Sequence, residues 1–319
     1  MSKLVGFAGE VSVTERLVCA ASVRADATAV VGGAWRDGRA SGEYYSYGTF
    51  AFLVQAAAAG LTWRGLRPKD VVGVIVPDAA GFALAVHAVR AAGGVPSPVD
   101  PALCAAESAG QLAESGARMV IASAALAAVA LAAADRSWVR QVFCFGEALG
   151  TTPFAELLGT DIVRPSRGRP DDVALLPFSR GVDGRLRPVP VTHSEFGRRL
   201  GLLDRRAGIS ETDVVLATPP VGDGLDYALM LDCALLHGAT LVVVRTQELA
   251  AAAAERAASV AIVPRGWRGV LGGQVRILRA RPLTDEGTAT GTSLALSVSG
   301  GKRACRPHRG RQARRLAHR

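Results

Sequence analysis

Short apolar runs alternate with longer helical segments along this chain, and that alternation limits the folds open to it. The runs are brief and rich in β-branched residues, which is typical of strands buried on both faces of a sheet. They lie at residues 71–76, 95–99, 119–122 and 139–145. The expected helices between them are residues 79–92, 105–115 and 124–134. This β-α-β order predicts an α/β fold with a mostly parallel sheet covered on both faces.

The same alternation precedes and follows these residues. Further helices are expected at residues 12–30, at 50–59 with Gly60 as the stop, and at 194–207, 227–237 and 248–258. Further strands are expected at residues 44–47, 214–218, 241–244, 261–263 and 275–278. A connection rich in Pro, Gly and Arg breaks the pattern and is read as a linker. The resulting division is a first α/β subdomain at 1–163, the linker at 164–170, a partial second subdomain at 171–286, and a low-complexity basic tail at 287–319.

Cysteine spacing and hydropathy argue against several classes of protein. The five cysteines lie far apart without a C-x-x-C pair, so neither a disulfide framework nor a zinc site is indicated, and no metal ligand is assigned. A reducing cytoplasm is therefore the expected location. Residues 119–134 are apolar but too short to span a bilayer, and the N-terminus lacks the apolar core of a signal peptide. We expect no membrane association.

The positive charge is concentrated at one end. The formal net charge is +9, and eight of the 37 Lys and Arg residues lie in residues 300–319, which contain no acidic residue. The rest of the chain is therefore nearly neutral. We expect no nucleic-acid partner except through this tail, where a few phosphate contacts would give salt-sensitive binding.

Residues 176–193 contain a strong turn signal. The Asp183-Gly184 dipeptide supplies the positive φ angles that a tight hairpin turn needs. Two runs that can be extended, residues 175–179 and 186–191, flank it. One interpretation of this stretch is therefore a β-hairpin.

The other interpretation of the same stretch is a phosphate-binding loop. Ser179 offers a hydroxyl, and Gly181 and Gly184 let backbone N–H groups face an anion. Arg180, Arg185 and Arg187 supply cations that could reach that anion. Spacing alone leaves both interpretations open, because glycine loops are weak signals.

Four stretches resemble, in collinear order, the large N-terminal domain of the adenylate-forming acyl-CoA synthetases, which include 4-coumarate:CoA ligases and firefly luciferase. They are Tyr45-Ser-Tyr-Gly-Thr-Phe50, Gly65-Leu-Arg-Pro-Lys-Asp-Val-Val-Gly-Val-Ile-Val-Pro-Asp78, Ala91-Ala-Gly-Gly-Val-Pro-Ser-Pro-Val-Asp-Pro101 and Gln111-Leu-Ala-Glu-Ser-Gly-Ala117. The resemblance implies two stacked β-α-β subdomains, the second incomplete here. It also implies an AMP-forming ligase that activates a small carboxylic acid, aryl or fatty, using ATP, Mg²⁺ and CoA.

The turn-rich stretch lies where that family has its signature Ser/Thr-Ser-Gly-Thr-Thr-Gly-x-Pro-Lys-Gly, followed by Thr-His. The positions that agree are Ser179, Gly181, Gly184, Thr192 and His193. Arg187 takes the place of the lysine and keeps its positive charge. By resemblance these residues would bind the nucleotide. His193 also fits a structural role at a helix start, and His87 and His237, on apolar helices, fit structural roles as well.

Several departures from the family pattern argue against normal catalysis. Val182 and Asp183 replace the two threonines, and an ionised Asp183 about 4 Å from a phosphate would cost on the order of 4 kcal/mol. Arg279 stands where the family has a small residue beside its acyl pocket. No Tyr-Gly-x-Thr-Glu motif follows residue 286, and no catalytic residue is assigned. The alternative function is a non-catalytic pseudoenzyme or remnant that binds a nucleotide, an acyl group or a partner protein.

The partial second subdomain also predicts how the chain behaves in solution. Strands at residues 214–218 and 241–244 would form open edges of an incomplete sheet, and open edges pair with other chains. We therefore expect self-association. The residues after about 287 have no periodicity and are either a natural tail or out-of-frame translation.

Overall fold

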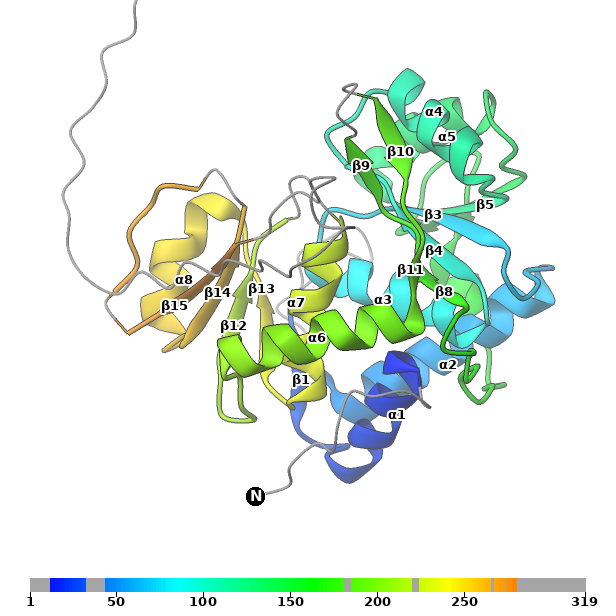
Figure 1. Cartoon of the computed structure of the whole chain (residues 1–319). Helices are drawn as coiled ribbons and strands as arrows, with labels where there is room; N and C mark the ends of the chain where they lie inside the picture. The colour runs from blue at the N-terminus through cyan, green and yellow to red at the C-terminus, as the bar shows by residue number, and fades with distance from the viewer. Residues whose placement is uncertain are drawn as a thin grey trace, which may run out of the picture.

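Two large sheets with helices packed around them, and two short two-stranded sheets, make up the described part of the protein (Figure 1). The structure is a computed structural model, and it describes residues 12–32, 44–180, 185–219, 224–264, 267–272 and 274–279. One sheet has five strands in the order β4-β3-β5-β6-β7, and the other has six in the order β15-β14-β12-β13-β1-β2. Most pairings are parallel, which confirms the predicted α/β class.

The five-stranded sheet follows the expected alternation closely. Its strands are β3 (Val71–Ile75), β4 (Val95–Pro98), β5 (Met119–Ser123), β6 (Gln141–Phe145) and β7 (Thr152–Pro153). Every pairing in it is parallel. The helices in this part are α3 (Ala79–Ala91), α4 (Ala105–Ser115), η1 (Ala124–Leu126) and α5 (Ala127–Ala134), and the short η2 is Phe154–Leu157.

Helices cover both faces of this sheet. Val72 and Val74 pack with α3 in the larger core, whereas Ile75 packs with α4 and α5 in a second core. Successive strand residues point to opposite faces, so a strand covered on both sides needs apolar residues at every position. This explains why β3 is a continuous apolar run.

The six-stranded sheet takes strands from both ends of the described chain. Its strands are β1 (Thr28–Val31), β2 (Tyr44–Ser46), β12 (Val214–Ala217), β13 (Thr240–Val243), β14 (Val260–Val263) and β15 (Arg276–Arg279). Its helices are α6 (His193–Ala207), α7 (Gly224–Leu236), η3 (Thr246–Glu248) and α8 (Leu249–Glu255). Only the β1–β2 pairing is antiparallel.

The expected open edges at residues 214–218 and 241–244 are wrong. β12 lies between β13 and β14, and β13 lies between β12 and β1. The reason is that β1 pairs with β13 in parallel, with Val30 opposite Leu241. In the described residues the outer strands are β2 and β15. The six-stranded sheet therefore combines strands that precede residues 164–170 with strands that follow them. The subdomain boundary placed at these residues stays a prediction.

The expected helix at residues 12–30 is too long. Helix α1 is Val13–Val23, and residues 28–31 form β1 instead, because pairing with β13 buries Ala29 and Val30 completely. Ser12 caps the helix by accepting a hydrogen bond from the Glu15 N–H at 3.2 Å. Thr14 is buried, and its hydroxyl lies 2.9 Å from His87 Nδ1.

Gly60 does not stop its helix, contrary to expectation. Helix α2 is Tyr47–Trp63 and runs through this glycine. A Cβ at residue 60 would lie far inside van der Waals distance of the Leu157 carbonyl. The glycine therefore allows η2 to approach the middle of α2.

The sequence predicts no membrane association, and the lengths and hydropathy of the helices bear on this prediction. Among the described residues, no helix combines the length and the apolar character needed to cross a bilayer.

Candidate functional site

The stretch with the turn signal folds as a hairpin. Strand β9 (Phe178–Arg180) pairs antiparallel with β10 (Leu186–Pro188), which confirms the hairpin interpretation. The hairpin lies beside α4 (Figure 1). Gly181 and Gly184, two predicted site residues, lie outside the described residues.

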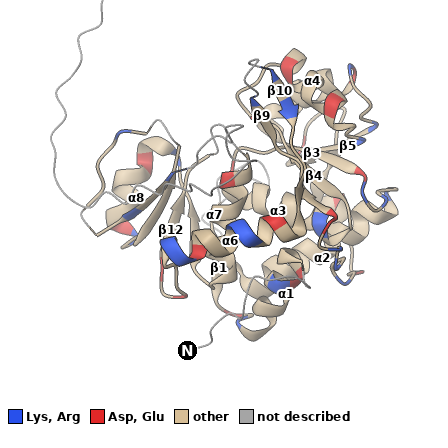
Figure 2. Ribbon diagram, viewed as in Figure 1, with Lys and Arg blue, Asp and Glu red and all other residues tan. Residues whose placement is uncertain are grey.

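The register of the hairpin brings two predicted site residues together. Ser179 on β9 is directly opposite Arg187 on β10. Side chains opposite each other in an antiparallel pair project from the same face, whereas Arg180, the next residue along β9, projects from the other face. Ser179 is buried and Arg187 is exposed, so from this shared face the longer arginine side chain reaches solvent. Figure 2 shows basic residues on both strands of this hairpin.

The base of the hairpin is attached to the five-stranded sheet. Strand β8 (Val173–Leu175) pairs antiparallel with β11 (Val191–Thr192) on the two sides of the hairpin. After β8, the Leu176 N–H donates to the Pro96 carbonyl at 2.9 Å, and the Ser97 hydroxyl donates to the Leu176 carbonyl at 2.8 Å. These bonds fix the start of the loop to β4.

Thr192 is the N-cap of α6. Its hydroxyl accepts a hydrogen bond from the Glu195 N–H at 3.2 Å and lies 3.0 Å from the Ser194 hydroxyl. The hydroxyl therefore already satisfies a free N–H group at the helix start. The positive end of the α6 dipole lies at the end of the loop.

His193 begins α6 and packs on the linker. Its backbone N–H donates to the Asp172 carbonyl at 2.9 Å. Gly168 has a φ of +59°, and a Cβ there would lie 2.7 Å from His193 Nε2. Burial, and after it the charge of Arg90, lowers the pKa of His193 to about 4, with Asp172 opposing the shift. The imidazole is neutral at pH 7, and these contacts support the structural role; the nucleotide role stays a prediction.

A buried ionic network that sequence reasoning missed lies behind the hairpin. Arg90 Nη1 is 2.9 Å from Asp232 Oδ2, and His87 Nε2 is 3.0 Å from Asp232 Oδ1. All three side chains are at most 2% exposed. Burial alone would raise the pKa of the Asp232 carboxyl, but the charges of His87 and Arg90 outweigh it and hold that pKa below its usual value.

Arg90 links this network to the base of the loop. Its Nε donates to the Ala174 carbonyl of β8 at 2.8 Å, and its guanidinium lies 4.4 Å from the centre of the Phe196 ring on α6. One side chain of α3 thus contacts α7, β8 and α6. The signal was available in the sequence as an arginine and an aspartate, Arg90 and Asp232, within mostly apolar helices.

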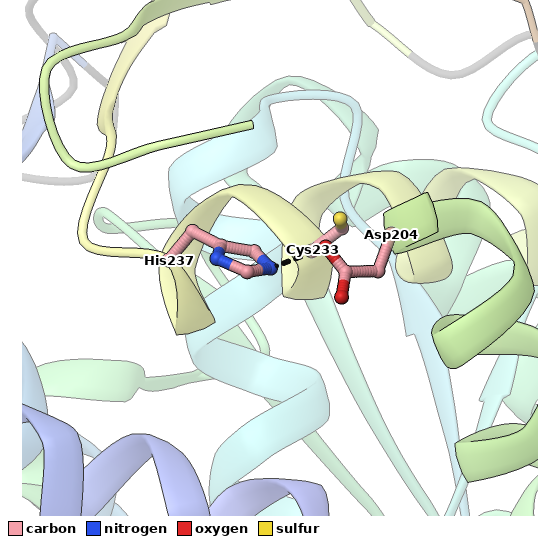
Figure 3. A group of neighbouring side chains, drawn as sticks. All are labelled: Asp204, Cys233 and His237. Carbon is pink, nitrogen blue, oxygen red and sulfur yellow. Dashed lines mark ion pairs between the residues drawn. The ribbon is translucent and has the colours of Figure 1, made fainter. Parts of the chain in front are cut away.

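Three potential metal ligands meet where α6 and α7 pack together (Figure 3). They are Asp204 on α6, Cys233 on α7 and His237 directly after α7. One ligand atom of each lies within 4.8 Å of the others. The spacing of the cysteines does not reveal this cluster, because Asp204 comes close to Cys233 only where α6 packs on α7.

Comparison with known proteins identifies relatives of this chain. The family model for AMP-binding enzymes matches residues 19–319. The 4-coumarate–CoA ligase 2 of Solanum tuberosum is 24% identical over 217 residues, which cover 66% of this chain and 40% of that protein. The 4-coumarate–CoA ligase-like 3 of Oryza sativa is 31% identical over 217 residues, which cover 60% of this chain and 36% of that protein. The chain spans about two fifths of the length of these relatives.

Solved structures show the same fold. A long-chain-fatty-acid–CoA ligase from Archaeoglobus fulgidus matches with a TM-score of 0.71 and 18% identity, over 83% of this chain and 55% of that one. MbtA from Mycobacterium smegmatis matches with a TM-score of 0.71 and 25% identity, over 82% of this chain and 49% of that one. A benzoate CoA ligase from Burkholderia xenovorans matches with a TM-score of 0.67 and 22% identity, over 80% of this chain and 50% of that one.

Proposed function

Because the chain belongs to the AMP-binding enzyme family, we propose that it is an acyl-CoA synthetase-like carboxylate ligase whose β9–β10 hairpin binds the phosphates of ATP. The observation that carries this proposal is the pairing of Ser179 with Arg187 on one face of the hairpin. A hydroxyl donor and a guanidinium on one face are groups that bind a phosphate.

The proposed reaction has two steps. The carboxylate of a small aryl or fatty acid attacks the α-phosphorus of ATP, and the bond from that phosphorus to the bridging oxygen breaks, releasing pyrophosphate. The thiol of CoA then attacks the carbonyl carbon of the acyl-adenylate, and AMP leaves. In this scheme Ser179 donates a hydrogen bond to a phosphate oxygen, and Arg187 offsets the negative charge that the phosphates carry.

Mg²⁺ is implied by the family resemblance, and the hairpin itself does not fit it. The described hairpin residues contribute one hydroxyl and three arginines, at residues 180, 185 and 187, but no carboxylate. Mg²⁺ is held by carboxylates and phosphate oxygens, so cationic side chains would repel it. No step of the proposal is therefore assigned to a metal held by this hairpin.

A nucleotide-binding protein without turnover is the second candidate. The sequence observation that favours it is Asp183, an acid in place of a threonine in the loop that would surround the triphosphate. Repulsion of a phosphate by an ionised carboxylate weakens both ATP binding and the charge-separated transition state. In this second candidate the hairpin still binds the nucleotide, but the protein does not activate a carboxylic acid.

One pair of variants tests the binding element. Arg187→Ala should weaken ATP binding about 10-fold or more, because a hydrogen bond to a charged group contributes about 1.5–3 kcal/mol. Arg180→Ala is the matched control, since it removes the same charge from the opposite face of the same hairpin. Calorimetric titration with ATP measures both. Equal effects of the two variants would reject the proposed face.

A second measurement separates the two candidates. Pyrophosphate release is followed over a panel of aryl and fatty acids, with CoA and Mg²⁺ present. Release with at least one acid supports the ligase. ATP binding without release across the panel supports the nucleotide-binding protein. Absence of both from a folded protein would reject both functions.

A further inference from the structure

The cluster of Asp204, Cys233 and His237 has a geometry that the proposed function does not use (Figure 3). Cys233 and His237 are four residues apart, and the His237 N–H donates to the Cys233 carbonyl at 3.3 Å, which continues the helical pattern of α7. Residues at this spacing lie on the same face of a helix. Gly238, with a φ of +77°, then turns the chain away and leaves His237 at the helix end. Asp204 completes the group from α6, which packs against α7.

The three side chains differ in exposure. Cys233 is fully buried, while the side chains of Asp204 and His237 are 27% and 17% exposed. Asp204 Oδ1 and His237 Nε2 form an ion pair at 2.6 Å, and His237 Nε2 makes no hydrogen bond with a described residue. The cluster therefore places a thiol at its base and an imidazole and a carboxylate at its mouth.

These donors are the ligand types of zinc. Thiolate sulfur, imidazole nitrogen and carboxylate oxygen bind Zn²⁺ at about 2.3, 2.0 and 2.1 Å in a tetrahedral arrangement. Neighbouring ligand atoms in such a site are about 3.3–3.7 Å apart. The ligand atoms here lie within 4.8 Å of one another, so small side-chain rotations bring them to a common ion. A zinc site with three protein ligands takes a water in the fourth position.

The charge around the cluster also favours a cation. Burial, followed by the negative charges of Asp204 and Asp232, raises the pKa of the Cys233 thiol. The negative charges of Asp204 and Asp232, which disfavour a thiolate at Cys233, attract a divalent cation. A catalytic role for this thiol is disfavoured, since a fully buried cysteine is not accessible to a substrate.

We propose that Asp204, Cys233 and His237 bind one zinc ion, with a water as the fourth ligand, and that this ion joins α6 to α7. Its expected effect is to stabilise the packing of these two helices. Helix α6 begins at the end of the nucleotide hairpin, and α7 carries Asp232 of the buried network, so the ion holds together the helices behind the proposed nucleotide site.

The test uses Co²⁺ as a coloured substitute for zinc in the full-length chain carrying Cys305→Ser. This background is needed because Cys305-Arg-Pro-His308 in the tail offers a second thiol and imidazole. After treatment with a chelator, the chain should bind one equivalent of Co²⁺ with a thiolate-to-cobalt charge-transfer band and the visible bands of tetrahedral coordination. One equivalent of Zn²⁺ should remove the bands and raise the thermal unfolding midpoint by several degrees.

Variants in the same background decide the ligands. Cys233→Ala should lose the charge-transfer band, and His237→Asn should weaken Co²⁺ binding at least about 10-fold. Cys144→Ala is the matched control, because Cys144 is also fully buried but lies in β6 of the other sheet. If Cys233→Ala does not fold, Asp204→Asn is used instead, because the Asp204 side chain is partly exposed. This variant should weaken Co²⁺ binding by a similar factor. Failure to bind a stoichiometric ion, or a thiolate band that survives in a folded Cys233→Ala protein, would overturn the proposal.

Discussion

At the scale of single residues, Arg90 connects three elements near the proposed site. It contacts Asp232, the Ala174 carbonyl and the Phe196 ring from a buried position. Arg90→Met should lower the free energy of unfolding by about 3–5 kcal/mol, because it leaves a buried carboxylate without its main partner. Arg118→Met, at an exposed position, should change it by less than about 0.5 kcal/mol. Urea unfolding measures both, and a mild effect of Arg90→Met would contradict the network.

His193 gives the protein a defined pH dependence. Its pKa is lowered to about 4 in the folded protein, while an unfolded histidine has a pKa near 6.5. Below about pH 6.5 the unfolded chain takes up a proton that the folded chain refuses, so stability falls as the pH is lowered from 6.5 to 4. Because the side chain is partly exposed, we expect a loss of about 1–2 kcal/mol rather than the full shift. The His193→Asn variant should lack this part of the slope in urea unfolding at several pH values, and an unchanged slope would refute the assignment.

At the scale of elements, two helical glycines test how the helices are packed, because Gly60 is in close contact with another element and Gly110 is not. Gly60→Ala should destabilise the protein by about 1–3 kcal/mol or more, since its methyl group would collide with the Leu157 backbone. Gly110→Ala, in the middle of α4, meets no atom within 4 Å and should stabilise by about 0.5–1 kcal/mol. Thermal and urea unfolding should therefore shift in opposite directions. Shifts of the same sign would contradict the close packing of η2 on α2.

The elements also show which features local sequence patterns reveal. The buried strands and the hairpin could be predicted, because apolar runs and the Asp183-Gly184 turn are local signals. Strand β1 could not, since residues 28–31 continue a helix-like pattern and their partner β13 lies more than 200 residues away, as the Thr240 hydroxyl bond to the Thr28 carbonyl illustrates. The Asp204 cluster was missed for the same reason, because no sequence spacing connects Asp204 to Cys233.

At the scale of the whole molecule, the N-terminal segment completes the second sheet. β1 covers the edge of β13, so the apolar strands β12 and β13 are interior. The self-association expected from exposed edges at these two strands therefore loses its basis. It should return when the covering strand is removed, since a bare apolar edge pairs with other chains.

Two deletions at opposite ends test this dependence. A chain lacking residues 1–46 loses α1, β1 and β2, which exposes the edge of β13, and it should sediment as oligomers or precipitate. A chain lacking residues 300–319 loses eight positive charges but none of the strands described in the second sheet, so its sedimentation should match that of the full chain. Analytical ultracentrifugation at moderate salt compares the three proteins. If the N-terminal deletion sediments as a folded monomer, β1 is not what protects β13. If the tail deletion alone associates, the net charge rather than the sheet edge controls solubility.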